Sequence, residues 1–316
     1  MISLPPGLVH AGRLAMRRLF DSMVAVFGVM TLIFVVSRLL GDPTVLFLPI
    51  GATPEQVHAL SAQMGLDRPI AAQYAHFVWQ VLHGDFGRSY TFMQPALPVI
   101  MHYLPATLLL GTTAIVLGIV IGGTAGSIAA LCRERMAGNV IMVVAIIGQA
   151  TPVFWLGVVL ILMFSVYLGW LPAGGYGTAS ALVLPALTLG CYTSATIARL
   201  LRGSLVETMQ EDYVRTAHAE GLLSRTVFFF YLLRNALLPV TGMVAILAGE
   251  LLGGSVVTEI VFSWPGIGRL IVQAIETRDF PLVQAGIMVL ALIFITVNLM
   301  TDLLQALLDP RLRGLA

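Results

Sequence analysis

Six long apolar stretches recur along this chain and limit what it can fold into. Each reaches the roughly 20 mostly apolar residues that a helix needs to cross a bilayer. Of the 316 residues, 58% are hydrophobic and 10% are charged, whereas soluble domains carry about 25% charged residues. The sequence therefore predicts an all-α integral membrane protein with six transmembrane helices, at about 17–39, 103–131, 139–169, 181–201, 235–262 and 283–307.

Two of these stretches need separate interpretation. The first follows Arg13, Arg17 and Arg18, a charge pattern that signal peptides share. It is longer than a signal core and no small-residue cleavage site follows it, so we expect an uncleaved first span. The third is long enough to tilt or break, and we expect Pro152 to kink it because proline removes a helix hydrogen bond.

The distribution of arginine predicts the orientation in the membrane. If the N-terminus is cytoplasmic, twelve of the 17 basic residues lie on the inner side and five on the outer side. Cytoplasmic loops carry such an excess. Both terminal segments, 1–16 and 308–316, and the polar segment 202–234 are then cytoplasmic, while 40–102 and 263–282 are external.

The first external segment carries helix signals. The run from Thr53 to Gln56 is typical of a capping box with proline at the first helical position, and Gly65 would end that helix. Pro69 opens a second helix, whose predicted apolar face holds Ile70, Tyr74, Phe77 and Val81. His76 and His83 lie seven residues apart on it, and solvated or packed histidines explain that spacing better than a metal site.

The second external segment predicts a short helix too. Pro265 and two glycines interrupt the fifth apolar stretch, and the residues after them show helical amphipathic spacing: Ile267, Leu270, Ile271, Ala274 and Ile275.

Glycines form a stripe along the second apolar stretch. Gly118, Gly122 and Gly126 recur every fourth residue, a spacing that lets two helix backbones approach closely. The helix that packs into this seam can belong to a partner subunit or to this chain, and the sequence leaves both alternatives open.

The chain lacks the residues of an enzyme or a self-powered pump. It has no lysine, and therefore no GxxxxGK loop for ATP, and its six histidines all lie outside the apolar cores. We find no nucleophile with a base and no metal-ligand spacing, so we expect a passive subunit with no cofactor of its own.

Glu250 is the one carboxylate deep within an apolar stretch, since Glu259 lies nearer a helix end. We take Glu250 and Gln149 as candidate pathway-lining residues, although a local hydrogen bond or a protonated acid also explains Glu250. A secondary transporter or channel that uses Glu250 as an ion or substrate site is the alternative function.

The polar segment 202–234 carries the densest charge of the chain. Ser204 to Glu207 predicts a capping box for one helix, and Ser224 is expected to cap another. Between them Val214, Ala217 and Gly221 share one side at helical spacing, and we expect this small-residue side to dock closely against another surface. Gly221 suits the helix stop because glycine adopts positive φ without strain, and Pro239 marks the return to the membrane. An amphipathic connector resting on lipid headgroups is the alternative.

This segment resembles the cytoplasmic EAA loop of ABC-importer permeases, whose pattern is Glu-Ala-Ala, three residues, Gly, and a later Leu-Pro. Here Arg215-Thr216-Ala217, Gly221 and Leu238-Pro239 occupy those places, and only the second alanine and the glycine match strictly. DYVRTAxAxGL followed by LRNALLPV is similar to the dipeptide, oligopeptide and nickel branch of the family. Further elements similar to that branch are GLDRP at 65–69, GDFGRS at 84–89, LGWLPAGG at 168–175, LLGGSVVTEIVFSWPGIGRL at 251–270 and LLQALLDPRLR at 303–313.

The resemblance implies the first (B-type) permease subunit of a type I importer with the MetI-like fold, in the inner membrane of a bacterium. It implies a sister permease, two ABC ATPases that hold ATP and Mg, and an external solute-binding protein that contacts 54–90 and 264–280. The solute would be a di- or oligopeptide or a related small solute such as a nickel chelate. The helix that docks on the ATPase would comprise Asp212, Tyr213, Val214, Arg215, Thr216, Ala217 and His218, with Gly221 as its stop.

Overall fold

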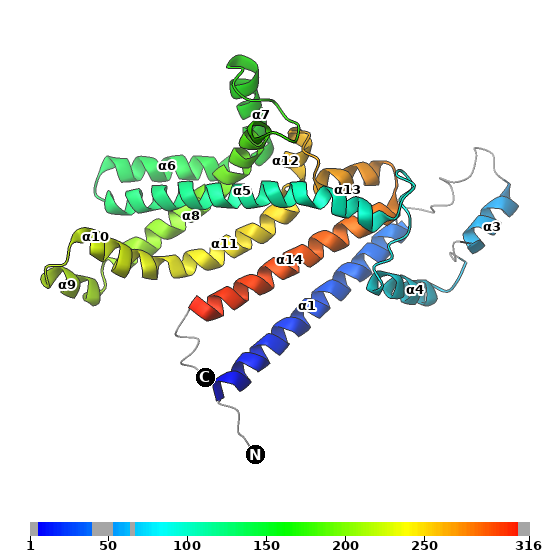
Figure 1. Ribbon diagram of the computed structural model, residues 1–316, viewed down its shortest axis with the longest axis horizontal. Coiled ribbons are helices and arrows are strands. Elements are labelled where there is room, and N and C mark those ends of the chain that lie inside the picture. Colours follow the sequence, from blue (N-terminus) through cyan, green and yellow to red (C-terminus); the bar gives the residue numbers. More distant parts are fainter. Residues whose placement is uncertain (1–5, 40–52, 64–66, 309–316) are drawn as a thin grey trace. The chain divides into compact units, whose positions relative to one another are not determined.

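The computed structural model describes residues 6–39, 53–63 and 67–308. Within these ranges the chain consists of helices and their connections, with no strand beyond an isolated bridge between Arg88 and Pro95 (Figure 1). The predicted all-α class is therefore confirmed. Four helical runs in the described part are long and apolar enough to cross a membrane: Ala96–Leu131, Ala179–Thr208, Ser224–Leu251 and Phe280–Thr301.

The other two predicted spans differ from a simple helix. The third is a broken pair, α6 (Met136–Ala150) and Val153–Tyr167, bent by 103°. Pro152 sits in the break with φ −58° and ψ 131°, where proline was expected to interrupt the helix. The first span, α1 (Pro6–Leu39), has a described apolar part, Phe20–Val36, that is shorter than the others. The number six therefore stays a prediction.

The chain divides into two units. The first comprises residues 105–269 with the terminal pieces 1–11 and 294–316. Its helices include most of α5 (Ala96–Leu131), α6, α7 (Val153–Leu160), and the π-helical segment η1 (Ile161–Tyr167). They continue with α8 (Ala179–Thr208), α9 (Asp212–Ala219), α10 (Ser224–Thr226), the π-helical segment η2 (Val227–Leu233), α11 (Arg234–Gly254) and α12 (Val256–Val261).

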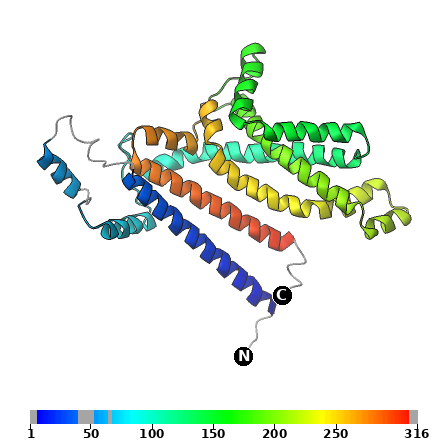
Figure 2. The ribbon, with the colours of Figure 1, turned by 180° about the vertical axis from the view of Figure 1, so that it is seen from behind.

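Helix α8 forms the centre of this first unit, with α5, α6 and α11 running beside it (Figure 2). Two thirds (67%) of its most apolar window is buried, against 28% for the run Ser224–Leu251. The side chains that α11 leaves exposed are mostly apolar, and exposing them to water is unfavourable. The outward faces of this unit are therefore suited to lipid or to another membrane subunit.

The glycine seam lies between α5 and α8 of this chain. Gly118 faces Thr193, Gly122 faces Ser194, and a Cβ built on Gly126 would lie 2.6 Å from the carbonyl oxygen of Ala198. Any larger residue would force the two helices apart. Of the two alternatives that the sequence left open, packing within the chain is the one observed.

The second unit comprises residues 12–104 and 270–293. It includes most of α1, α3 (Pro54–Gln63), α4 (Ile70–Leu82) and the first half of α14 (Phe280–Leu308). Its core joins Met30 and Ile33 of α1 to Met288 of α14, with Phe77 and Val81 of α4 packed against them. Tyr74 shares a 2.6 Å hydrogen bond with Thr31, whereas Ile70, predicted on the same apolar face, is 73% exposed and does not join this core.

The predicted capping box of α3 is confirmed. The Thr53 amide donates to Gln56 Oε1 at 3.1 Å, and the Gln56 amide donates to Thr53 Oγ1 at 3.4 Å. Gly65, the predicted stop of this helix, lies outside the described residues. The short amphipathic helix expected after Pro265 is also present, as α13 (Ile267–Glu276).

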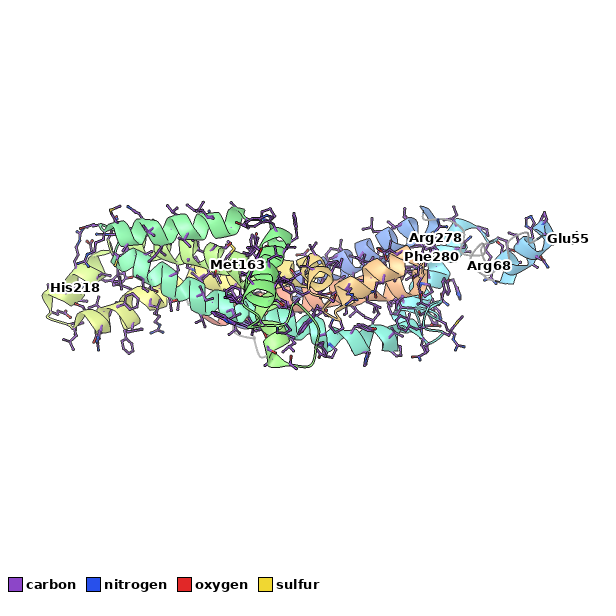
Figure 3. All side chains as sticks on the ribbon, turned by 90° about the horizontal axis from the view of Figure 1, so that it is seen from above. Glu55, Arg68, Met163, His218, Arg278 and Phe280 are labelled. Carbon is purple, nitrogen blue, oxygen red and sulfur yellow. The ribbon has the colours of Figure 1, made fainter. Side chains whose placement is uncertain are left out.

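A buried carboxylate organises the turn before α14. Asp279 is fully buried and accepts hydrogen bonds from Ser89 Oγ at 2.5 Å and from the Thr91 amide at 2.9 Å. Burial, together with the Asp279 charge, raises the pKa of Tyr90 to about 12, so this phenol stays protonated. Figure 3 labels Arg278 and Phe280, the residues that precede and follow Asp279 in the chain. The turn at 88–95 is thereby fastened to the start of α14.

Candidate functional site

The polar segment is shorter than the sequence predicts. Helix α8 continues to Thr208 through the run Ser204–Glu207, so the capping box expected there is wrong. Ser224 is the first residue of α10, and the residue at the cap position is Leu223, without a side-chain cap. From Ser224 a continuous helical run leads into α11, which contains Pro239 in its interior. The connection that remains, residues 209–223, carries α9, and Figure 1 shows α9 and α10 at the end of α8 and α11 that lies away from α7.

Gly221 ends α9 as expected. Its φ is +78°, and the Gly221 amide donates to the His218 carbonyl at 3.0 Å while the Leu222 amide donates to the Ala217 carbonyl at 3.2 Å. This pair of hydrogen bonds is the Schellman motif. Glycine is favoured here because a side chain at this φ is strained.

The predicted docking face of α9 is reversed. Val214 and Ala217 are 3% and 2% exposed and pack in a core with Leu201 and Leu205 of α8 and with residues of η2 and α11. The small residues thus let α9 lie close against this chain's own helices. The expectation that they form an outward surface is wrong, since spacing shows that residues share a side but not what covers it.

The outward face of α9 is polar. Its exposed residues are Asp212, Tyr213, Arg215, Thr216, His218 and the small Ala219. The Arg215 guanidinium lies 3.5 Å from the Asp212 carboxylate, and both side chains are largely solvent-accessible. Exposed pairs of this kind contribute about 0–1 kcal/mol, so both charges are available to a partner at little cost. Figure 3 shows His218 at this end of the first unit, well away from Met163 of η1.

A side-chain hydrogen bond fastens α9 to α11. Asn235 Nδ2 donates to Tyr213 Oη at 3.0 Å and to the Tyr231 carbonyl at 2.8 Å. Because Val214 and Ala217 already attach α9 to α8 and η2, α9 is in contact with both neighbouring long helices, α8 and α11. The Tyr213–Asn235 pair was not predicted, because two exposed polar residues 22 positions apart carry no local signal.

The two candidate pathway residues lie in different surroundings. Glu250 is exposed on α11, so its carboxylate is open to whatever adjoins this face of the chain. Gln149, at the end of α6, donates from Nε2 to Thr196 Oγ1 of α8 at 3.3 Å and so ties these two helices together. The pathway role of both residues stays a prediction.

Among the described residues of this unit, Glu259, whose sequence position lies near a predicted helix end, is a fully buried carboxylate. It lies in α12 at 0% exposure and accepts hydrogen bonds from Thr107, Ser255 and the Arg269 amide. The sequence feature associated with Glu259 is the run Pro265-Gly266-Ile267-Gly268, because both of its glycines lie against the Glu259 carboxyl group. In the described ranges no group of three or more His, Cys, Asp or Glu residues could hold a metal ion.

The comparisons with known proteins cover most of the chain. Residues 122–314 match the family described as binding-protein-dependent transport system inner membrane component, and residues 12–111 match the N-terminal part of such membrane components. The chain is 40% identical to the glutathione transport system permease protein GsiC of Escherichia coli K12 over 298 residues, which is 94% of this chain and 97% of that protein. The same figures hold for GsiC of Shigella dysenteriae serotype 1.

Solved structures with a similar fold come from the inward-facing MetNI methionine ABC transporter. One crystal form aligns with a TM-score of 0.57 at 18% identity, covering 66% of this chain and 95% of that one. A second aligns with a TM-score of 0.53 at 20% identity, covering 66% and 96%. At these identities the likeness concerns the fold, and it agrees with the MetI-like architecture that the sequence predicts.

Proposed function

The chain belongs to the family of inner membrane components of binding-protein-dependent transport systems, and on that premise we propose that α9 is the helix through which an ATPase subunit drives it. As an ABC importer permease it is a multi-pass subunit of the inner membrane. The observation that carries the proposal is the two-sided packing of α9. Its inner face is buried against α8 and η2, while its outer face is polar and exposed.

This packing suits a helix that receives force from outside and transmits it inward. A helix resting on headgroups would turn its apolar face toward lipid, but the apolar face of α9 is occupied by Leu201 and Leu205. The exposed face offers a carboxylate, a guanidinium and an imidazole, groups that can pair with a polar protein surface. A protein partner therefore fits α9 better than a lipid surface does.

The assembly that we propose holds this permease, a sister permease, two ATPases and an external binding protein. ATP and Mg would be bound by the ATPases, and this chain would catalyse nothing. Closure of the ATPases on ATP would displace α9, and with it α8 and α11, and so open the pathway to solute from the binding protein. The termini and α9 would be cytoplasmic, and segments 40–102 and 263–282 external.

The solute that we propose is a short peptide, including glutathione-like peptides, and a nickel chelate is the second candidate. The support is the 40% identity to permeases named for glutathione transport. A test is uptake of labelled glutathione, dipeptides and a nickel chelate into proteoliposomes that hold the complete complex and its binding protein. Uptake of the nickel chelate alone would replace the peptide assignment.

The energy source separates this proposal from a secondary transporter built around Glu250. Uptake should stop when the partner ATPases cannot hydrolyse ATP, and it should persist with a protonophore. Uptake that survives loss of ATP hydrolysis and stops with the protonophore would favour the alternative instead.

The docking surface can be tested by charge reversal at Arg215, which lies on the exposed face of α9. We expect Arg215→Glu to lower solute-stimulated ATPase activity and uptake while the permease stays folded, because the side chain makes only the exposed Asp212 pair. Arg133→Glu is a matched control, since Arg133 forms a comparable exposed pair with Glu134 at 3.7 Å outside α9. Equal effects of the two substitutions would count against docking through α9.

A further inference from the structure

A buried carboxylate fastens the end of the first unit opposite to α9. Glu259 belongs to α12, which follows α11 after Ser255 and lies at the end of α11 away from α9 (Figure 1). Its side chain is 0% exposed. Burying a carboxylate is unfavourable unless hydrogen bonds compensate, so the contacts that hold it indicate what it is for.

The carboxyl group of Glu259 is the acceptor in three hydrogen bonds. Thr107 Oγ1 donates to Glu259 Oε1 at 2.9 Å, and Ser255 Oγ donates to the same oxygen at 3.1 Å. The Arg269 amide donates to Oε2 at 2.9 Å. Both oxygens act as acceptors, and the donors come from three separate places in the chain.

The same contacts satisfy the start of α13. The first amides of a helix have no partner within the helix. Here the Ile267 amide donates to Thr107 Oγ1 at 2.8 Å, and the Arg269 amide donates to Glu259. Since Thr107 accepts from Ile267, its own hydroxyl proton is free to go to Glu259. The hydroxyl of α5 and the carboxyl group of α12 thus hold the first turn of α13 together.

Two glycines leave the space that the Glu259 carboxyl group fills, because a side chain on either would collide with it. A Cβ on Gly266 would overlap the carboxyl group of Glu259, and one on Gly268 would lie 2.9 Å from its Oε2. Trp264, between α12 and α13, is 1% exposed and donates from Nε1 to the Ala106 carbonyl of α5 at 2.9 Å. The break between α12 and α13 is therefore attached to α5 at two adjacent residues, 106 and 107.

We propose that Glu259 is a positioning residue of the transport cycle, which keeps α12, the first turn of α13 and the adjoining part of α5 moving as one piece. The inference rests on the proposed function, in which force enters at α9. Tyr213 and Asn235 attach α9 to the start of α11, and α11 leads into α12. A displacement of α11 then reaches Glu259, which passes it to α5 and to the external helix α13. Without this contact, a movement of α12 would no longer move the first turn of α13 with it.

The test uses the hydroxyl partner, because Glu259→Gln itself would set an amide NH₂ among donors and can prevent folding. Thr107→Val keeps the shape of the side chain and removes the hydroxyl that joins Ile267 to Glu259. Thr107→Ser restores the hydroxyl. Thr112→Val is the matched control on the same helix, because Thr112 is exposed and its hydroxyl donates only to carbonyls of its own helix.

Two quantities are measured on the complete complex in proteoliposomes: hydrogen exchange of peptides that cover 264–272, and solute transported per ATP hydrolysed. We expect Thr107→Val to raise exchange in this segment at least about tenfold, because it removes both the hydrogen bond from the Ile267 amide and the one to Glu259. We also expect it to lower transport per ATP several-fold, with basal ATPase activity unchanged. Thr107→Ser should restore both quantities, and Thr112→Val should change neither.

Faster exchange with unchanged transport per ATP would overturn the proposal, because Glu259 would then serve stability alone. Unchanged exchange in Thr107→Val would overturn it too, since the first turn of α13 would not depend on this contact. Failure of the proposed function gives a different result, namely ATP-independent transport in the unsubstituted complex. That outcome would remove the positioning role together with the function on which it rests.

Discussion

Ala217→Asp tests whether α9 must stay attached to the helices of this chain, which is a separate requirement from docking on a partner. Ala217 is 2% exposed and packs with Leu201, Leu205 and Val214. An aspartate there would place a carboxylate in an apolar core without a partner, at a cost of about 3–5 kcal/mol. This cost acts mainly on the attachment of α9, because α9 is a short helix held by few contacts.

The free energy that the contacts of α9 contribute is smaller than this cost or comparable with it. Burial of Val214 contributes about 1.5–3 kcal/mol, and the Tyr213–Asn235 hydrogen bond about 0.5–1.5 kcal/mol. We therefore expect Ala217→Asp to detach α9 from α8 and η2 while the membrane helices stay folded. Arg215→Glu, two residues away on the exposed face, should leave α9 attached.

Hydrogen exchange of peptides covering 212–219 measures the attachment, and transport per ATP measures the coupling. We expect fast exchange and lost coupling for Ala217→Asp, but slow exchange and weakened coupling for Arg215→Glu. If Ala217→Asp keeps the slow exchange of the unsubstituted protein, the inward placement of Ala217 is refuted.

The other predictions concern glycine positions and the link to α11. Gly221→Ala should destabilise the end of α9 by about 1–2 kcal/mol because of its positive φ, seen as faster exchange of residues 217–222. Gly122→Ala should lower the thermal stability of the permease, since the new Cβ meets the backbone of Ser194. Gly123→Ala is the control with nothing within 4 Å and should be neutral or slightly stabilising; equal melting temperatures for the two variants would refute the seam. Tyr213→Phe should lower transport per ATP without changing assembly of the complex, and unchanged transport would show that the Asn235 contact carries no force.

Features that depend on neighbouring residues were predictable from the sequence. The capping box at Thr53 and Gln56, the break at Pro152 and the positive φ of Gly221 are all present. Each follows from local backbone chemistry, in which a proline removes a donor or a glycine permits a left-handed conformation. The family resemblance, too, came from short runs of residues along the chain.

Features that depend on distant contacts were not predictable. Ser204 to Glu207 has the residues of a capping box, but α8 passes through it because Leu201 and Leu205 are buried in the core below α9. Glu259 is bound by Thr107, 152 positions earlier. A single sequence carries no measure of such a pairing, so Glu250 was favoured as the deep carboxylate although it is exposed on α11.

Docking of the exposed face of α9 on an ATPase subunit can be tested with a photo-crosslinking residue at Thr216. Thr216 lies on that face, and its hydroxyl bonds only to the Asp212 carbonyl of its own helix. We expect a crosslink between this position and an ATPase subunit in intact membranes, with a yield that changes when ATP is added. A crosslink to lipid alone, unchanged by ATP, would contradict it.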